Sequence, residues 1–179
     1  MQEQRTGAVT LRGKRLTLLG RDLRPNDPAP PFELVGQCSL PSQMAPVRLS
    51  DFRDKVLIVS CVPSLDTPVC DRETRHWEEE REKLVRDEVE LLTVSLDLPF
   101  AQNRWCSSAG VQHRTASAYR NHDFGIDYGV LVKELQLLAR AAFVIGKEGR
   151  IKYVEYVPEI AEEPHYERII EAARRAVAD

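Results

Sequence analysis

The sequence predicts an α/β fold in which helices cover both faces of a central mixed sheet. Val56–Val62 is apolar on both of its alternating faces, as in a central strand that is buried on two sides. A helical pattern from Cys70 to about Asp87 leads to a second buried strand at Val89–Leu96, and the three segments form a βαβ unit. The strands Ala141–Ile145 and Arg150–Val157 flank a glycine turn and add an antiparallel pair.

Turn residues, prolines and periodicity define the remaining elements. An N-terminal β-hairpin is expected over about residues 8–20, with Gly13 in its turn because glycine adopts positive φ readily. Arg24–Pro31 holds four of the eleven prolines and is expected to be an extended connector. Short extended pieces follow at Phe32–Val35 and Val47–Phe52.

Two further helices complete the pattern. Phe100–Ser107 is expected to form a short helix, and Pro164 is expected to begin the last one. The inner face of that last helix carries apolar side chains at helical spacing, namely Tyr166, Ile169, Ile170, Ala173 and Val177. No repeat or long linker divides the sequence, so we expect a single domain over residues 1–179.

Composition and charge narrow the classes of function. Hydrophobic residues make up 42% and charged residues 30% of the 179 positions, as in a globular protein. A net charge of −3 argues against a nucleic-acid binder that relies on bulk positive charge, and no apolar run is long enough to span a membrane. The polar start Met1–Gly7 lacks a signal-peptide pattern, so we expect a cytoplasmic protein whose four cysteines are thiols.

The segment from Pro63 to Cys70 carries the clearest chemical signal. It leaves the carboxyl end of a buried strand, where ligands bind in open α/β sheets. Cys70 falls in the first helical turn, where free N–H groups and the helix dipole stabilise a thiolate, and the Thr67 hydroxyl can turn toward the sulfur. Taken alone, this spacing also fits an inert buried cysteine beside a helix cap from Asp66 or Thr67.

Pro63, Thr67 and Cys70 match the PxxxTxxC motif of the peroxiredoxins. The sequence resembles the bacterial thiol peroxidase branch of that family, the atypical two-cysteine enzymes, over nearly its whole length. The other segments that resemble this branch are the N-terminal hairpin, Asp97–Cys106, Tyr119–Gly125, Leu138–Ala141 and Glu162–Tyr166.

This resemblance implies a thioredoxin-like fold, a homodimer and a cofactor-free peroxidase active in antioxidant defence. The enzyme would reduce hydrogen peroxide and alkyl hydroperoxides to water and alcohols. Cys70 would be the peroxidatic nucleophile and become a sulfenic acid, which Cys106 would resolve as an intramolecular disulfide. Thioredoxin would reduce that disulfide in each turnover.

Ionisation of the thiol does not by itself explain a fast peroxidase. At pH 7 a thiol with a pKa of about 8.5 is about 3% ionised, and a thiol with a pKa of about 6 is about 90% ionised. The thiolate of lower pKa is, however, roughly tenfold less nucleophilic, so most of this gain is lost. Donors at the two peroxide oxygens stabilise the transition state more strongly. We therefore assign this role to Arg140, Thr67 and the backbone N–H of Cys70, while Pro63 shapes and dries the pocket.

Each assignment has a plainer alternative. Arg140 fits a surface salt bridge, Pro63 fits a simple loop breaker, and Cys106 fits a buried packing residue. If Cys70 and Cys106 do pair, their Cα atoms must approach to about 4.4–6.8 Å. Because a cysteine in the first turn of a packed helix seldom offers its sulfur to a distant segment, we expect this turn and Phe100–Ser107 to unwind on oxidation.

The other ionisable residues near this motif and elsewhere carry weaker signals. Asp71 and Glu73 lie close to Cys70, and their negative charges disfavour its thiolate form. The positive charge of Arg72 favours it. Cys61 fits a buried small hydrophobe, and Cys38 lies in a loop where it could be exposed. The cysteines and histidines lack the paired spacing of a zinc site.

Two other functions remain open from the sequence. A cysteine hydrolase would use Cys70 with a distant histidine and would be indifferent to Cys106. A redox sensor or holdase would use the same disulfide as a switch and would turn over slowly. Peroxide turnover that depends on both cysteines separates the peroxidase from both alternatives.

Overall fold

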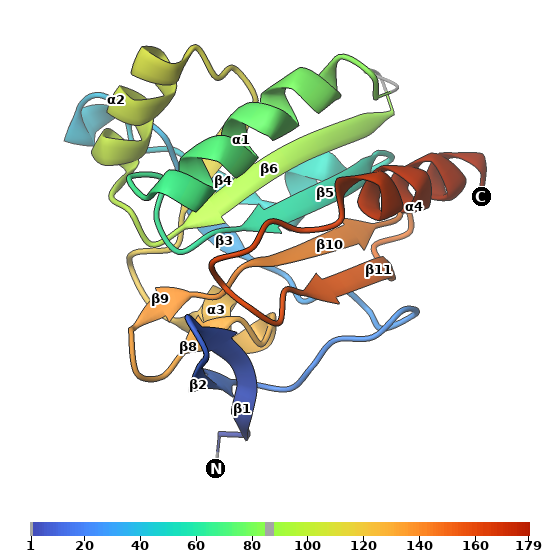
Figure 1. Ribbon diagram of the computed structural model, residues 1–179. Helices are drawn as coiled ribbons and strands as arrows, with labels where there is room; N and C mark the ends of the chain where they lie inside the picture. The colour runs from blue at the N-terminus through green and yellow to red at the C-terminus, as the bar shows by residue number, and fades with distance from the viewer. Residues whose placement is uncertain (1, 85–87) are drawn as a thin grey trace.

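The computed structural model describes residues 2–84 and 88–179. Its main sheet consists of β3 (Glu33–Gly36), β4 (Pro46–Arg48), β5 (Val56–Cys61), β6 (Val89–Ser95), β7 (Arg114–Ser117), β10 (Ala141–Ile145) and β11 (Ile151–Tyr156). These strands lie in the order β11-β10-β5-β6-β7-β3-β4, so β5 is an interior strand between β10 and β6 (Figure 1). β5 pairs in parallel with β6 and antiparallel with β10, so the predicted βαβ unit and the predicted antiparallel pair β10–β11 share one sheet.

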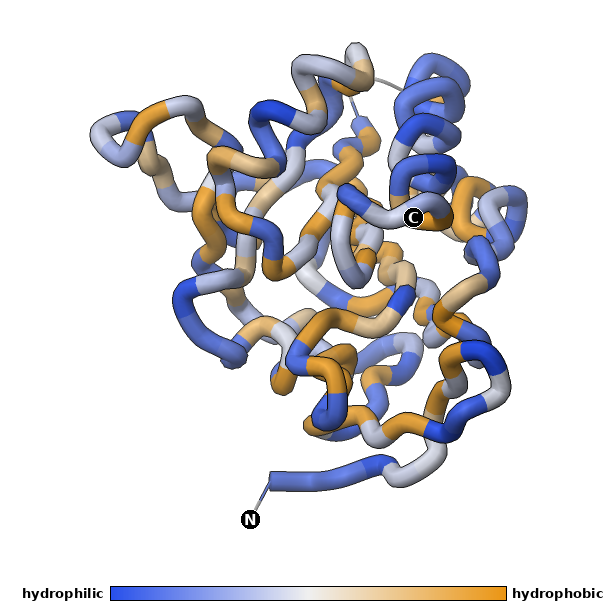
Figure 2. Tube along the Cα trace, turned by 60° about the vertical axis from the view of Figure 1, so that its left-hand side comes forward, coloured by the Kyte–Doolittle hydropathy of each residue, from blue (hydrophilic) through white to orange (hydrophobic). Residues whose placement is uncertain are grey.

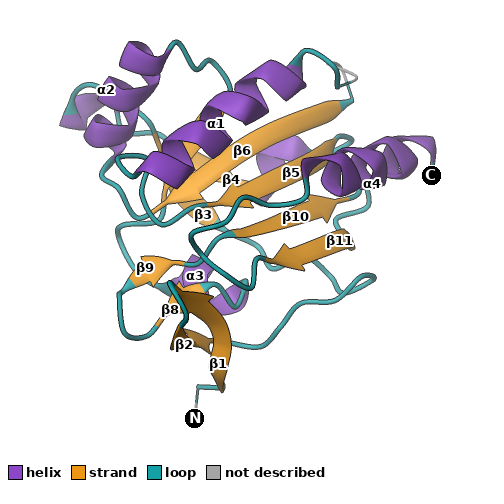
Figure 3. Cartoon of the chain, in the orientation of Figure 1, coloured by secondary structure: helices purple, strands orange, loops and turns teal. Residues whose placement is uncertain are grey.

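Helices cover both faces of this sheet, as predicted. α1 (Pro68–Arg81) and α4 (Tyr166–Ala178) contribute Trp77 and Ile169 to an apolar cluster on one face (Figures 1 and 3). α3 (Asp123–Asp127) contributes Phe124 to the cluster on the other face. Every residue of β5 is buried because side chains cover it from both sides, which is the physical reason for its mostly apolar sequence.

A second, smaller sheet lies beside the first and contains the N-terminal hairpin. It joins β1 (Gln4–Leu11), β2 (Lys14–Leu19), β8 (Leu131–Val132) and β9 (Leu137–Leu138) in that order. Gly13 in the hairpin turn has a φ of 78°, the left-handed conformation expected there. Figure 2 shows hydrophobic residues gathered in the interior of the trace and a hydrophilic N-terminal end.

Several boundaries differ from the sequence prediction. α1 ends at Arg81, although the helical pattern continues to Asp87, and the last part of that pattern, residues 85–87, lies outside the described residues. The final helix begins at Tyr166 rather than at Pro164. The connector 24–31 is extended except for a turn at residues 25–26.

The other helical elements are α2 (Pro99–Ala109) and the 3-10 turns η1 (Pro41–Gln43) and η2 (Leu49–Phe52). α2 includes the short helix predicted over residues 100–107 and extends beyond it at both ends. In the described part of the chain, no helix combines the length and the apolar character that crossing a bilayer requires.

Candidate active site

Cys70 lies in the first turn of α1, at the carboxyl end of the central strand, where the sequence places it. Thr67 precedes the helix with an extended backbone, and Pro68 is its first residue. The Cys70 side chain is fully buried against Val62 and Leu65. The helix therefore begins at a residue whose sulfur is held in an apolar environment, next to N–H groups that have no acceptor within the helix.

Two polar side chains converge on the sulfur of Cys70. The hydroxyl of Thr67 is 2.9 Å from Sγ, and Nη2 of Arg140 is 3.3 Å from it. Thr67 Oγ1 is also 2.8 Å from the carbonyl oxygen of Ser64. Since a hydroxyl carries one hydrogen, Thr67 donates to Ser64 when it accepts the thiol proton of Cys70, and it donates to Sγ when the sulfur is a thiolate.

The plainer alternatives for Thr67 and Arg140 do not describe this structure. Thr67 is the N-cap residue of α1 but makes no side-chain capping bond, and its hydroxyl lies between the Ser64 carbonyl oxygen and the sulfur instead. Arg140 is only 1% exposed and therefore is not a surface arginine. It directly precedes β10, which explains why its side chain lies inside the molecule.

Three groups fix the guanidinium of Arg140. Nη1 donates to the carboxylate of Glu73, Nε donates to the carbonyl oxygen of Ile160 at 2.9 Å, and Nη2 faces Cys70. Desolvation opposes the charge of Arg140, but Glu73 and Cys70 outweigh this effect, so its pKa is raised. The arginine therefore stays cationic and presents one N–H edge to the sulfur.

Glu73 is the buried partner that sequence reasoning did not identify as part of the site. Its carboxylate has no exposed surface and accepts hydrogen bonds from Ser60 Oγ at 2.8 Å and Trp77 Nε1 at 3.4 Å besides that of Arg140. Burial raises the pKa of Glu73, and the charge of Arg140 opposes the rise. Its position three residues after Cys70 was the available signal, because this spacing shares a helix face.

A second carboxylate holds the loop between β5 and α1. Asp97 accepts hydrogen bonds from the Ser64 hydroxyl at 2.7 Å, the Leu65 N–H at 2.8 Å and the Ser95 hydroxyl at 2.7 Å. The loop that carries Thr67 is thereby tied to the segment before α2. Pro63 begins this loop in a half-buried position.

Cys106 lies apart from this polar cluster. It is buried in α2, and its Sγ is 3.7 Å from Thr115 Oγ1 on β7. Burial raises the pKa of the Cys106 thiol. All four cysteines are free, and both helices are intact. The structure thus brings together Cys70, Thr67 and Arg140, whereas Cys106 faces Thr115.

Polar contacts join α1 to α2 next to the two cysteines. Trp105 Nε1 donates to Asp71 at 3.2 Å, and Arg75 Nη1 donates to the carbonyl oxygen of Ala109 at 3.1 Å. The Arg75 guanidinium also lies over the Trp105 ring, 5.7 Å from its centroid. A shallow hollow of about 420 Å³ opens beside these contacts, and it is lined by Leu65, Asp66, Thr67, Pro68, Asp71, Arg72 and Trp105. A small solute can approach the Cys70 turn from this hollow.

The remaining cysteines and histidines have structural surroundings. Cys61 is buried on β5, and desolvation, assisted by Glu73, raises its pKa. Cys38 is buried rather than exposed, because its loop packs against the start of α2, where its N–H lies 3.4 Å from the Pro99 carbonyl oxygen. His113 pairs with Glu78. Within residues 2–84 and 88–179, no group of three or more potential ligands is arranged to hold a metal ion.

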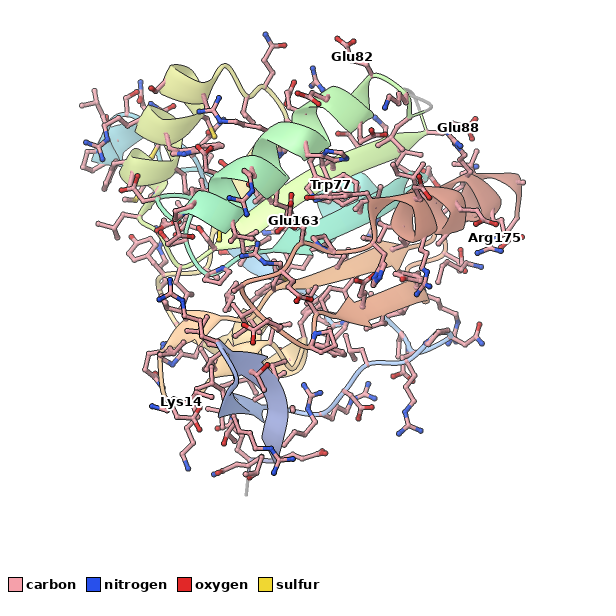
Figure 4. All side chains as sticks on the ribbon, viewed as in Figure 1. Lys14, Trp77, Glu82, Glu88, Glu163 and Arg175 are labelled. Atoms are coloured by element: carbon pink, nitrogen blue, oxygen red, sulfur yellow. The ribbon has the colours of Figure 1, made fainter. Side chains whose placement is uncertain are left out.

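The side chain of Trp77 extends from α1 toward α4 (Figure 4) and belongs to the apolar cluster to which α4 contributes. Its ring packs edge-on against Tyr166, with centroids 5.0 Å apart. Trp77 thus fixes the buried face of α1 that also carries Cys70 and Glu73.

Comparisons with known proteins place the chain in a family. A sequence model of the Redoxin family matches residues 24–170. A thiol peroxidase of Halalkalibacterium halodurans is 48% identical over 171 residues, 95% of this chain and 99% of that protein. A thiol peroxidase of Bacillus subtilis is 42% identical over 170 residues, 94% of this chain and 98% of that protein.

Solved structures show the same fold. A peroxiredoxin-like protein from Aquifex aeolicus superposes with a TM-score of 0.84 at 38% identity, and the match covers 98% of each chain. A thiol peroxidase from Chromobacterium violaceum gives a TM-score of 0.81 at 19% identity over 93% of this chain and 95% of that one, a likeness of fold.

Proposed function

Because the chain belongs to the Redoxin family, as a peroxidase of the thiol peroxidase branch of the peroxiredoxins, we propose that Cys70 reduces hydrogen peroxide and alkyl hydroperoxides. The membership confirms the resemblance predicted from Pro63, Thr67 and Cys70. The observation that carries the proposal is the convergence of Thr67 and Arg140 on a fully buried sulfur at a helix N-terminus.

The reaction is an attack of the Cys70 thiolate on one peroxide oxygen. The S–O bond forms as the O–O bond breaks, sulfur is oxidised to a sulfenic acid, and the departing oxygen leaves as water or an alcohol after taking up a proton. Negative charge moves from the sulfur to the oxygens, so donors that reach the peroxide oxygens beside Sγ stabilise the transition state more than the ground state. Arg140, Thr67 and the free N–H of Cys70 supply those donors.

Pro63 supports this step through the loop it begins. Its ring removes one backbone donor and restricts the backbone next to the buried strand. In the proposed mechanism Pro63 shapes the pocket and limits the water that reaches the sulfur.

The second step is resolution by Cys106. Its sulfur attacks the sulfenic sulfur of Cys70, water leaves, and an intramolecular disulfide forms. Because Cys106 faces Thr115 in the reduced structure, both the first turn of α1 and the segment 100–107 must unwind for this bond. Thioredoxin reduces the disulfide through a mixed disulfide, and the enzyme works in the cytoplasm as a homodimer.

The test is peroxide consumption coupled to thioredoxin, thioredoxin reductase and NADPH. Wild type should turn over, Cys70→Ser should be inactive, and Cys106→Ser should react once with peroxide and then stall. Mass mapping of the alkylated, peroxide-treated wild type should show a Cys70–Cys106 bond. Peroxide consumption by Cys70→Ser at the wild-type rate would overturn the proposal.

The same assay separates the two alternatives. A redox switch would form the disulfide at similar peroxide concentrations but would not sustain NADPH oxidation. A cysteine hydrolase would need a histidine at the Cys70 sulfur, whereas the side-chain partners of this sulfur among the described residues are Thr67 and Arg140.

A further inference from the structure

The N-terminal hairpin is bonded directly to the loop between β11 and α4, beside which it lies (Figure 1). Thr10 N–H donates to the Pro158 carbonyl oxygen at 2.7 Å, and Ile160 N–H donates to the Thr10 carbonyl oxygen at 2.8 Å. Thr10 and Glu159 therefore form an isolated parallel bridge. This bridge fixes the position of a loop that has no regular structure of its own.

The Glu159 carboxylate strengthens this bridge by accepting the donors of the hairpin turn. One oxygen accepts the Arg12 N–H at 2.9 Å and the Ala161 N–H at 3.1 Å. The other accepts the Thr10 hydroxyl at 2.8 Å and the Gly13 N–H at 3.2 Å. Desolvation opposes the charge, but these donors prevail and lower the pKa of Glu159 to about 2, so it is ionised at neutral pH.

Ile160 connects this anchor to the active site. Its side chain is buried among Val9, Leu16 and Leu18 of the hairpin. Its carbonyl oxygen accepts the Nε hydrogen bond of Arg140 at 2.9 Å. The residue that packs into the hairpin therefore also holds the arginine.

Two anchors are needed to aim the guanidinium. A planar guanidinium held only at Nη1, by Glu73, can still tilt about that contact. The second contact, from Nε to Ile160, fixes the plane and directs Nη2 toward the sulfur at 3.3 Å. A small misplacement of such a donor costs rate, because transition-state stabilisation depends on preset geometry.

We propose that Glu159 is a positioning residue for peroxide reduction and that it acts through the hairpin, Ile160 and Arg140. This inference rests on the proposed function of Cys70. It makes the N-terminal hairpin a working part of the active site, although none of the hairpin residues named here contacts the sulfur.

The test compares Glu159→Gln with Glu134→Gln in the full chain. Glu134 is a matched control because its carboxylate also accepts a hairpin N–H, that of Thr17 at 2.9 and 3.1 Å, but it does not join the loop that supports Arg140. The second-order rate constant for oxidation of Cys70 by hydrogen peroxide is measured in single turnover. Glu159→Gln should lower it on the order of tenfold, whereas Glu134→Gln should change it by less than about twofold.

A double-mutant cycle with Arg140→Lys separates positioning from general destabilisation. If Glu159 acts through the guanidinium of Arg140, Glu159→Gln should lower the rate constant little further in the Arg140→Lys background. Equal fold-losses in both backgrounds, or a wild-type rate in Glu159→Gln, would overturn the inference. If Glu159→Gln does not fold, Thr10→Val removes one of the four donors and should give a smaller loss with the same dependence on Arg140. A wild type that does not react with peroxide at Cys70 would instead overturn the proposed function.

Discussion

The Thr67 hydroxyl can form a hydrogen bond with both the thiol and the thiolate forms of Cys70. Its single hydroxyl hydrogen lies between the carbonyl oxygen of Ser64 and the sulfur of Cys70. Release of the thiol proton therefore lets the hydroxyl rotate from one acceptor to the other without moving the backbone. This exchange keeps a donor next to the sulfur throughout the attack on peroxide.

Replacement of this hydroxyl should lower the rate without weakening the fold. Thr67→Val keeps the shape but removes the donor, so the second-order rate constant with peroxide should fall about a hundredfold. Thr67 makes no side-chain capping bond, and its hydrogen bond to the Ser64 carbonyl oxygen is exposed, so the free energy of unfolding should change little. Competition kinetics measure the rate, and Thr67→Ser, which restores the hydroxyl, should recover most of it. A Val variant as fast as wild type would remove Thr67 from the mechanism.

Glu73 should contribute to stability as well as to the site. The pair with Arg140 is buried on both sides, with side chains 0% and 2% exposed, so Glu73→Gln leaves an uncompensated cation inside the protein. We expect the free energy of unfolding to fall by about 3 kcal/mol in urea denaturation. The double variant Glu73→Gln, Arg140→Met should regain part of this loss. A loss below about 1 kcal/mol in the single variant would show that the Glu73 carboxyl is protonated in the folded protein.

These residues mark what sequence reasoning could and could not find. Cys70 and Thr67 follow from a motif with fixed spacing, and Arg140 follows from the family resemblance of the segment around it. The structure places Thr67 and Arg140 within hydrogen-bonding distance of the Cys70 sulfur. Glu73 lies within a run of charged residues, where its spacing from Cys70 is a weak signal, and the packing of α1 shows that it is buried, unlike its solvated neighbours. Glu159 acts through hydrogen bonds to residues nearly 150 positions away, as with the Thr10 hydroxyl, which leave no local pattern.

At the scale of elements, a buried histidine joins α1 to the entry of β7. His113 Nδ1 lies 2.8 Å from Glu78, and Nε2 lies 3.0 Å from Thr93 Oγ1. Because a carboxylate only accepts, Nδ1 carries the proton and Nε2 accepts from Thr93, which describes a neutral imidazole. Desolvation lowers the pKa of His113, and the bond from His113 lowers the pKa of Glu78 to about 2.

Both shifts predict that acid destabilises this junction. In the folded protein the pKa of His113 lies below its ordinary 6.5. As the pH falls below 6.5, the unfolded chain binds this proton before the folded protein does, so the free energy of unfolding falls. Glu78 adds a second loss between its ordinary 4.5 and about 2. Urea unfolding at a series of pH values should show the free energy falling from pH 7 to 5.

A substitution isolates the histidine contribution. Asn in place of His113 keeps a donor toward Glu78 but does not titrate, so the slope between pH 7 and 5 should become shallower. The matched control is the same substitution at His165, whose side chain is 62% exposed. An unchanged slope in His113→Asn would contradict the assignment.

Secondary structure was predictable where side chains carry a strong period. β10 is a continuous apolar run and β5 and β6 are mostly apolar, because the sheet is covered on both faces. β7 has four residues, three of them polar, and β8 and β9 have two residues each, too short to show any period. These strands form through tertiary pairing.

For the whole molecule, the predicted βαβ unit and antiparallel pair are correct, whereas β7 in the main sheet and the pairing of the second sheet were not predicted. The βαβ unit and the antiparallel pair follow from general rules of connection. The second sheet pairs Leu18 of the hairpin with Val132, a contact across most of the chain. Such a pairing depends on burial of apolar side chains of the hairpin against those of β8, and no local pattern in the sequence predicts it.

The proposed catalytic cycle requires this fold to open locally and then close again. Formation of the disulfide must break the contacts that Asp71 and Arg75 make with Trp105 and Ala109, along with the burial of Cys106. The central strands need not move, because their pairing does not involve either cysteine-bearing helix. Hydrogen exchange can therefore separate a local transition from a global one.

We expect amides in residues 68–75 and 99–109 to exchange on the order of a hundredfold faster in the disulfide form than in the reduced form. Amides of β5 and β10 should exchange equally in both. Mass spectrometry of peptides after one equivalent of peroxide makes the comparison, and Cys106→Ser, which cannot form the bond, should keep its protection in both helices. Equal protection of the two helices in the reduced and disulfide forms would mean that the sulfurs meet without unwinding, and the rigid-helix argument for local opening would fail.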